Sequence, residues 1–256
     1  MPSLTGLFVE PLYRWIYGRP AQGSAENAEG RVLVLGGVGR FDLLGIGLRY
    51  AAGAAGLPFS VEIFPWGHGF GRWFADLTRV DSRDRDASRL AEEIRRYRTD
   101  RPGSLVFIVA QSAGAGIAAL ALEQLDADTV ERVILLAPAL SPAYDLSRAL
   151  RAVRHEMVAF CSPVDLIILG VGTCLFGTID RVWTFGAGLV GFRVPASDQP
   201  GDDRTRQYRK LRQVRWRPSL MTLGHFGGHF GADGPRFLRK CVVPLLHVDS
   251  GPESPC

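Results

Sequence analysis

The sequence predicts an α/β protein in which a mostly parallel central sheet is covered by helices on both faces. Short apolar runs, rich in β-branched residues, alternate along the chain with longer segments of helical periodicity. Most of the runs lack polar alternation, which is typical of strands buried on both faces. Several of them also end in glycine or other small residues, as strands do before a turn into a helix.

Each expected strand is an apolar run that stops at a turn-forming or polar residue. The expected strands are 31–37, 59–66, 104–110, 130–140, 156–165 and a last strand within 217–231. The segments between them carry apolar residues at helical spacing, and Gly56 and Pro58 close the first. The expected helices are 43–55, 86–98, 113–125, 146–154 and 235–243.

The alternation of strands and helices breaks down between residues 166 and 215. A glycine-rich apolar half, 166–192, is followed there by a polar half, 197–210. We expect this range to be a lid-like insertion at the carboxyl edge of the sheet, within one domain that spans residues 31–256. The apolar run 166–176 is too short and too rich in glycine to be a membrane-spanning helix.

Residues 1–30 precede this domain and lack the basic start and unbroken apolar core of a signal peptide. They carry an apolar stripe at helical spacing, made of Leu7, Phe8, Leu12, Trp15 and Ile16. We expect a docking segment that packs on the domain. Weak attachment to a membrane surface is the less favoured alternative.

Composition excludes several classes of protein. With 46% hydrophobic and 22% charged residues the chain is globular rather than disordered. The net charge is +4, but the arginine clusters at 95–101 and 204–217 contain acids or aromatics and match no nucleic-acid-binding motif, so no nucleic-acid partner is expected. The four cysteines have no metal-type spacing, and Cys161 and Cys241 lie in apolar runs. We therefore expect buried thiols and a cytoplasmic location, with peripheral membrane attachment as the alternative.

Three of the expected strands end at or near side chains that can act as a nucleophile, an acid or a base. Ser112 follows the strand 104–110, Asp165 ends the strand 156–165, and two histidines lie in GHFGGHFG near the last strand. Ligands of such sheets bind beyond the carboxyl ends of the strands. Taken singly, a serine or an aspartate at such a position is also a common helix cap. The order Ser, Asp, His, with the serine at a strand–turn–helix corner, resembles the α/β-hydrolase family over residues 31–245.

The resemblance implies that Ser112 is a nucleophile, that a histidine is its general base and that Asp165 orients the base, with an acyl-enzyme intermediate. The family motif GxSxG is AQSAG here, so Ala110 replaces its first glycine and Gly114 supplies the second. The resemblance places one oxyanion donor at the amide of Ala113. The other lies in the loop GGVGRF, at Val38 or Gly37.

The histidine and the acid each have competitors. His229 is favoured over His225, because two glycines precede it and the start of the last helix follows. Asp165 is favoured over two other aspartates. Asp145 comes before the expected strand 156–165, and Asp180 lies inside the expected insertion. The pocket residues suggested beside these are His225, Gln111, and His68 in the loop PWGHGFG, where a structural role is equally expected.

We therefore expect a serine hydrolase that cleaves a carboxylic ester or related acyl bond of a small acyl or lipid-like substrate. No metal is expected, because HFGGH is not HExxH, and no cofactor, because a dinucleotide fingerprint is missing. The apolar side chains between 166 and 185 favour a greasy acyl pocket, although they equally fit a role in the core. The alternative function is a catalytically inactive protein of the same fold that acts as a binding or scaffold module; oligomeric state is left open.

Overall fold

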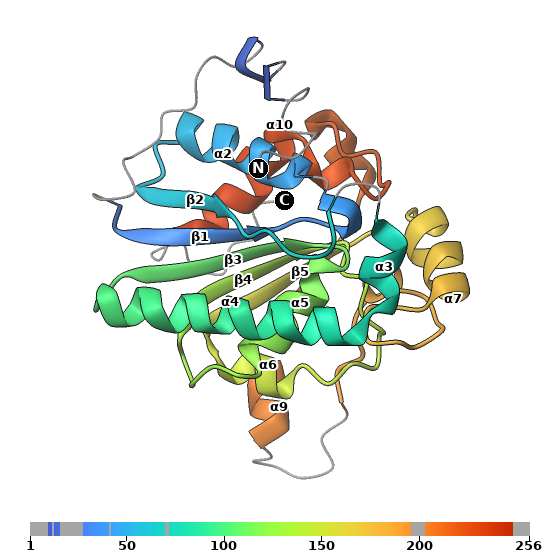
Figure 1. Ribbon diagram of the computed structural model, residues 1–256. Helices are drawn as coiled ribbons and strands as arrows, with labels where there is room; N and C mark the ends of the chain where they lie inside the picture. The colour runs from blue at the N-terminus through green and yellow to red at the C-terminus, as the bar shows by residue number, and fades with distance from the viewer. Residues whose placement is uncertain are drawn as a thin grey trace.

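A sheet of six parallel strands forms the centre of the molecule (Figure 1). The computed structural model describes residues 10–11, 13–15, 28–40, 42–69, 72–195 and 203–247. Across the sheet the strands follow the order β2-β1-β3-β4-β5-β6. Their bounds are β1 Gly30–Leu35, β2 Phe59–Ile63, β3 Leu105–Gln111, β4 Val130–Leu136, β5 Val153–Cys161 and β6 Leu211–Arg215.

The strands in the middle of the sheet are apolar on both faces. In β1, Leu33 and Leu35 belong to the core on one face, whereas Val32 and Val34 belong to the core on the other. Strand β3 alternates in the same way, and its Phe107 lies beside Val32. This two-sided burial explains why these strands are nearly continuous apolar runs.

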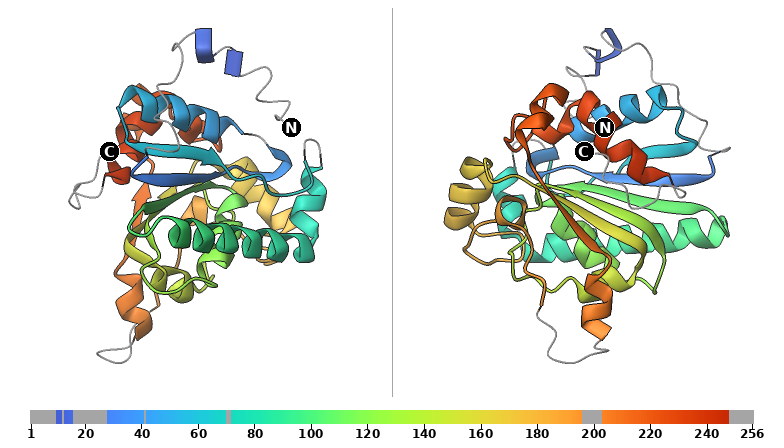
Figure 2. Two further views of the ribbon diagram at one scale, coloured as in Figure 1. Left: turned by 60° about the vertical axis from the view of Figure 1, so that its left-hand side comes forward. Right: turned by 180° about the vertical axis from the view of Figure 1, so that it is seen from behind.

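Helices cover both faces of the sheet (Figures 1 and 2). One face is covered by α4 (Val80–Asp100), α5 (Gly114–Leu122) and α6 (Ser147–Arg151), with α9 (Asp203–Tyr208) packed against α6. The other face is covered by α2 (Leu43–Ala54) and by the last helical segments, which are α10 (Pro235–Phe237), η5 (Leu238–Val242) and η6 (Val243–Leu246).

Short helices and loops gather where the strands end. They follow the individual strands as η1 (Val38–Arg40) after β1, α3 (Trp73–Thr78) after β2, η2 (Leu166–Gly172), α7 (Thr173–Phe176) and α8 (Ala187–Val190) after β5, and η3 (Pro218–Leu223) and η4 (Gly231–Asp233) after β6. Because all strands are parallel, these segments lie together at the carboxyl ends of the strands, where a ligand site is expected.

The α/β architecture with a parallel sheet between helices is confirmed, but the expected last strand is wrong. Residues 218–223 form the 3-10 helix η3, which begins at Pro218, a position that suits proline at a helix start. The sixth strand is instead β6, inside the range expected to be an insertion. Its sequence LRQVR is half-polar because β6 lies at the edge of the sheet.

The structure also bears on the cysteines and on the N-terminal apolar stripe. Cys161 is a buried free thiol, whereas Cys241 is disulfide-bonded, so the expectation of a thiol at Cys241 is wrong. Of the N-terminal apolar stripe only Trp15 is described, with 83% of its surface exposed; Leu7, Phe8, Leu12 and Ile16 lie outside the described residues. No helix in the described ranges has the length and apolar character that crossing a bilayer requires.

Candidate active site

Ser112 occupies a strained corner between β3 and α5. Its φ is +54°, in the left-handed region that L-residues with a side chain rarely adopt, at a typical cost of about 1–3 kcal/mol. Hydrogen bonds hold the corner in place: the Ser112 amide donates to the Leu136 carbonyl at 3.0 Å, and the Ser112 carbonyl accepts from the Ala139 amide at 3.0 Å. Such a corner lifts the serine side chain off the end of the strand.

The small residues around Ser112 allow the backbones to approach closely. A Cβ on Gly114 would lie 2.4 Å from the Gly36 carbonyl oxygen, so only glycine fits where α5 begins. Ala110 is completely buried between its neighbours Leu35 of β1 and Leu135 of β4. The alanine that departs from the GxSxG pattern is therefore packed into the sheet without displacing it.

The predicted base and acid meet directly. His229 Nδ1 lies 2.6 Å from Asp165 Oδ2, and both residues are buried. Asp165 lies just after β5, and His229 lies in the loop between η3 and η4. A carboxylate accepts a hydrogen bond from Nδ1–H, which keeps the proton on Nδ1 and leaves the lone pair of the ring on Nε2.

Ser112 and His229 line the same cavity, which has a volume of about 140 Å³. The cavity is lined by Gly37, Val38, Gln111, Ser112, Ile168, His229 and Phe230. Gly37 lies against the serine, since a Cβ on it would be 3.8 Å from Ser112 Oγ. A parallel sheet thus carries a serine on a strand–turn–helix corner, with the acid and the histidine from later strand ends. This arrangement of sheet, corner and strand ends matches the α/β-hydrolase fold.

The three predicted oxyanion residues lie beside Ser112. Gly37 and Val38 line the cavity, and the buried Ala113 directly follows the serine. Among the described residues, the backbone N–H groups of Gly37, Val38 and Ala113 have no protein acceptor. Backbone N–H groups left free beside a serine side chain are what an oxyanion hole would need.

Of the suggested pocket residues, Gln111 contacts the loop that carries His229, and His225 lies within this loop. The Gln111 side chain lines the cavity and donates from Nε2 to the His229 carbonyl at 3.2 Å, which joins β3 to the histidine loop. His225 does not line the cavity; its Nδ1 accepts from the Gly227 amide at 3.2 Å. Burial lowers the pKa of His225 to about 4, although Asp165 opposes this, so His225 is neutral near pH 7.

The remaining candidates lie elsewhere. His68 is not among the residues that line the cavity, and its Nδ1 lies 2.9 Å from Asp76 Oδ1. Asp180 accepts from the Ser141 amide at 2.8 Å, and Asp145 accepts from the Ser147 amide at 3.0 Å. Asp165 is therefore the carboxylate that the structure brings to His229.

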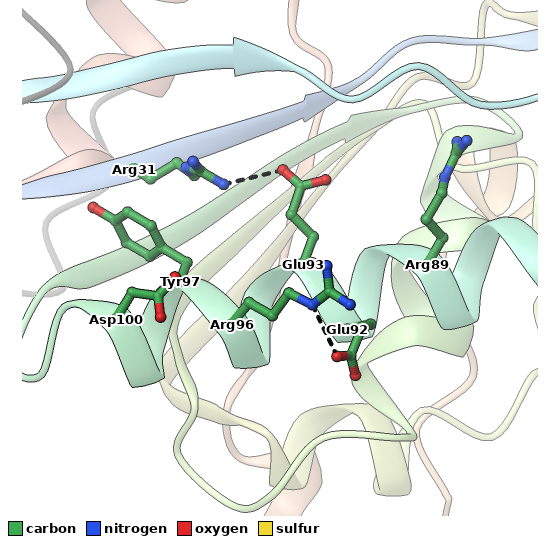
Figure 3. Close-up of a pocket in the computed structure, with 7 residues that line it drawn as sticks. All are labelled: Arg31, Arg89, Glu92, Glu93, Arg96, Tyr97 and Asp100. Atoms are coloured by element: carbon green, nitrogen blue, oxygen red, sulfur yellow. Dashed lines mark hydrogen bonds and ion pairs between the residues drawn. The ribbon is translucent and has the colours of Figure 1, made fainter.

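A larger hollow of about 440 Å³ lies away from these residues (Figure 3). It is bounded by charged side chains of α4 and by Arg31, which pairs with Glu93 at 3.0 Å. Arg31 is at the start of β1, so this hollow opens near the amino ends of the strands, away from the edge where such sheets bind ligands. The ion pairs around this hollow are those of a solvated face of α4 rather than of a ligand site.

Sequence reasoning missed Phe230 and Asp233. Phe230 lines the cavity together with His229. The one sequence feature that could have indicated this is that Phe230 directly follows His229. Asp233 is buried, and neither of its carboxyl oxygens has a hydrogen-bond donor among the described residues. Burial raises the pKa of Asp233 to about 7, and the nearby Gln111 amide lowers it in part. Within the described chain no group of three or more His, Cys, Asp or Glu residues is placed to hold a metal ion.

No protein-family model matches the sequence, and no curated protein matches it. Solved structures with a similar fold include a predicted CIB-like hydrolase from Thermoplasma acidophilum, with 16% identity, 88% of each chain covered and a TM-score of 0.46. A Trichoderma reesei cutinase in complex with a phosphonate inhibitor has 16% identity and a TM-score of 0.43, with 71% of this chain and 84% of the cutinase covered. The RedJ thioesterase from Streptomyces coelicolor has 15% identity and a TM-score of 0.41, with 86% and 96% covered. Likeness at this level says nothing about activity.

Proposed function

We propose that this protein is a serine hydrolase that cleaves a carboxylic ester or a related acyl bond. The observation that carries the proposal is that Ser112 and His229 line one cavity while Asp165 holds the far side of the His229 ring at 2.6 Å. A serine hydroxyl needs such a base to become a nucleophile, and the base needs an orienting carboxylate.

In the proposed reaction Ser112 Oγ attacks the acyl carbon while His229 Nε2 accepts the hydroxyl proton. The tetrahedral intermediate then expels the alcohol, which takes the proton from His229, and an ester of Ser112 remains. Water attacks this acyl-enzyme in turn, with His229 again accepting a proton and then returning it to Ser112 Oγ. The products are the free acid and the alcohol, and Asp165 stabilises the protonated ring throughout.

The negative charge of the intermediate requires donors that are in place before it forms. In this proposal the amides of Ala113 and of Val38 or Gly37 supply them. They lie next to Ser112 and have no other acceptor in the described part of the chain. Removing one such donor in other serine hydrolases typically costs about 10²–10³ in kcat.

The cavity favours an apolar acyl group. Ile168 and Phe230 line it together with Gly37 and Val38 of the glycine loop, and Phe230 is 51% exposed. Further large apolar side chains are exposed on the segments that follow β5, namely Val164, Leu166, Ile167, Val171, Leu175 and Phe176. A cavity of about 140 Å³ holds only a short group. A longer acyl chain would therefore extend over these side chains, which favours an esterase- or lipase-like substrate.

The test combines covalent labelling with turnover. Wild-type protein is expected to react with a fluorophosphonate at Ser112, identified by peptide mass, and to hydrolyse p-nitrophenyl esters. Ser112→Ala should lose both, whereas Ser219→Ala, which removes an exposed hydroxyl of η3, should keep both. A wild-type protein that shows neither labelling nor turnover would refute the proposal and favour the inactive scaffold. Labelling that persists in Ser112→Ala would refute Ser112 as the nucleophile.

A further inference from the structure

Two buried side chains hold the loop that carries the proposed oxyanion donors. Trp66 Nε1 donates to the Gly36 carbonyl at 2.9 Å, and Asp76 Oδ2 accepts from the Gly39 amide at 2.8 Å. Residues 37 and 38 lie between these two attachments. Trp66 and Asp76 both come from the segment that follows β2, and neither lines the cavity.

The Asp76 carboxylate is fully engaged by N–H groups. Its side chain is 1% exposed. Oδ1 accepts from the His68 amide at 2.6 Å and lies 2.9 Å from His68 Nδ1, while Oδ2 accepts from Gly39. In the described part of the chain its ion-pair partner is His68 alone. A buried carboxylate is costly unless it accepts such hydrogen bonds, so loss of the Gly39 contact would destabilise the folded protein.

Glycines on both sides make this arrangement possible. Gly39 has φ +75° and ψ 12°, a left-handed conformation that glycine adopts freely. Gly67 also has a φ of +75°, and a Cβ on it would lie 2.7 Å from Asp76 Oδ1. The backbone of both loops is therefore shaped around the carboxylate.

We propose that Asp76, assisted by Trp66, is the positioning residue of the oxyanion hole, and that it sets the rate of acyl transfer without touching the substrate. The inference rests on the proposed serine hydrolase function. Oxyanion donors act through preorganisation, because they must point at the developing charge before it appears. A loop attached at Gly36 and at Gly39 keeps the amides between these residues aimed at the space above Ser112.

The attachment extends to α4. With the Nδ1 proton donated to Asp76, His68 Nε2 accepts from the Ser82 hydroxyl, at 3.2 Å. Although this series resembles a second Ser–His–Asp set, Asp76 continues to the Gly39 amide, and the chain of bonds ends at the oxyanion loop. The role of His68 in this inference is thus to support Asp76.

The first test is Asp76→Asn. Asparagine has the same shape but one acceptor oxygen, so its NH₂ group must face either His68 or the Gly39 N–H. We expect kcat for a short p-nitrophenyl ester to fall by about 10- to 100-fold with KM little changed, and the rate of Ser112 phosphonylation to fall in parallel. Asp86→Asn is the matched control, because Asp86 accepts from the Gly67 amide at 2.8 Å in the same loop without touching residues 36–39. Its kcat should stay within about twofold of wild type.

Trp66→Phe is the second variant, because it removes the indole N–H while it keeps an aromatic ring in the core. We expect a smaller fall in kcat, about 3- to 10-fold, again with KM little changed. Hydrogen exchange of the Gly39 amide provides a readout besides activity, and it should accelerate in Asp76→Asn. Wild-type kcat in Trp66→Phe and in a folded Asp76→Asn would overturn the inference; if Asp76→Asn does not fold, Trp66→Phe alone decides. A wild-type protein that neither turns over esters nor labels would refute the proposed function instead.

Discussion

His229 Nδ1 and Asp165 Oδ2 face each other at 2.6 Å inside the protein, although the two residues are 64 positions apart in the chain. Both residues are buried, with 8% of His229 and 3% of Asp165 exposed, so solvent does little to screen their interaction. This contact determines which ring nitrogen of His229 is free to accept a proton, and it makes Asp165 the carboxylate to test first.

Asp165→Asn should leave the fold intact and lower kcat for ester hydrolysis by about 10³–10⁴-fold. The amide can donate to Nδ1, which moves the ring proton to Nε2 and removes the base that Ser112 needs. Steady-state kinetics with a p-nitrophenyl ester measures this. Asp180→Asn is the comparison, since Asp180 binds Ser141 instead. A larger kcat loss in Asp180→Asn than in Asp165→Asn would contradict the assignment.

Asp233 should make the protein less stable as the pH rises. Its folded pKa is about 7 against 3.8 for an ordinary aspartate, so the folded state holds a proton that the unfolded state has lost between these values. The free energy of unfolding should therefore fall between about pH 4 and pH 7, by at most roughly 4 kcal/mol. Asp233→Asn, followed by urea denaturation across this range, should flatten the decline and be more stable than wild type at pH 8.

His225 should act in the opposite direction. Its folded pKa is about 4 against 6.5 for an ordinary histidine, so the unfolded state binds the proton more readily between these values. Stability from this residue is complete above about pH 6.5 and is lost as the pH falls toward 4, by at most roughly 3 kcal/mol. In His225→Gln this acid-induced loss should shrink, as measured by urea denaturation at pH 4.5 and 7.5. An unchanged pH profile would show that His225 does not titrate as its burial implies.

Gly114→Ala should destabilise the protein by about 3 kcal/mol, because the new methyl group meets the Gly36 carbonyl oxygen at 2.4 Å and this oxygen belongs to the backbone. Gly228→Ala is the matched comparison: a Cβ there meets nothing within 4 Å, and its φ is not positive. Thermal denaturation of the two variants should separate them clearly. Equal melting temperatures would mean that α5 shifts at little cost.

Ile168→Trp should shorten the range of acyl groups that the protein accepts. The larger ring enters a cavity of about 140 Å³, so KM for a p-nitrophenyl butyrate should rise more than KM for the acetate. Val194→Trp is the control, because Val194 is 55% exposed, does not line the cavity and is not among the side chains proposed to contact a longer acyl chain. A parallel change in both variants would argue against the cavity as the acyl site.

The central strands and the order of the three site residues were predictable because their signals are local. β1, β3 and β4 are buried on both faces and read as apolar runs, and the turn after β3 needs small residues that the sequence displays around Ser112. The choice of His229 over His225 followed from the glycines before it, and the structure places His229 against Asp165.

What the sequence did not reveal depends on contacts between distant segments. β6 is an edge strand with half-polar sequence, so its pattern resembled a loop, while the apolar residues of η3 resembled a strand. The proposed roles of Trp66 and Asp76 depend on hydrogen bonds to Gly36 and Gly39, and no spacing of residues in the sequence indicates these bonds.

The backbone conformation at position 112 opposes the stability of the fold to the proposed activity of the serine. A glycine there would adopt a φ of +54° without strain, so Ser112→Gly is expected to melt at a higher temperature than the wild type while it loses the proposed hydrolytic activity. A chain shaped only to stay folded would do better with glycine at this position. The strain at this corner is therefore a conformational cost that the chain carries to present one hydroxyl oxygen at the cavity wall.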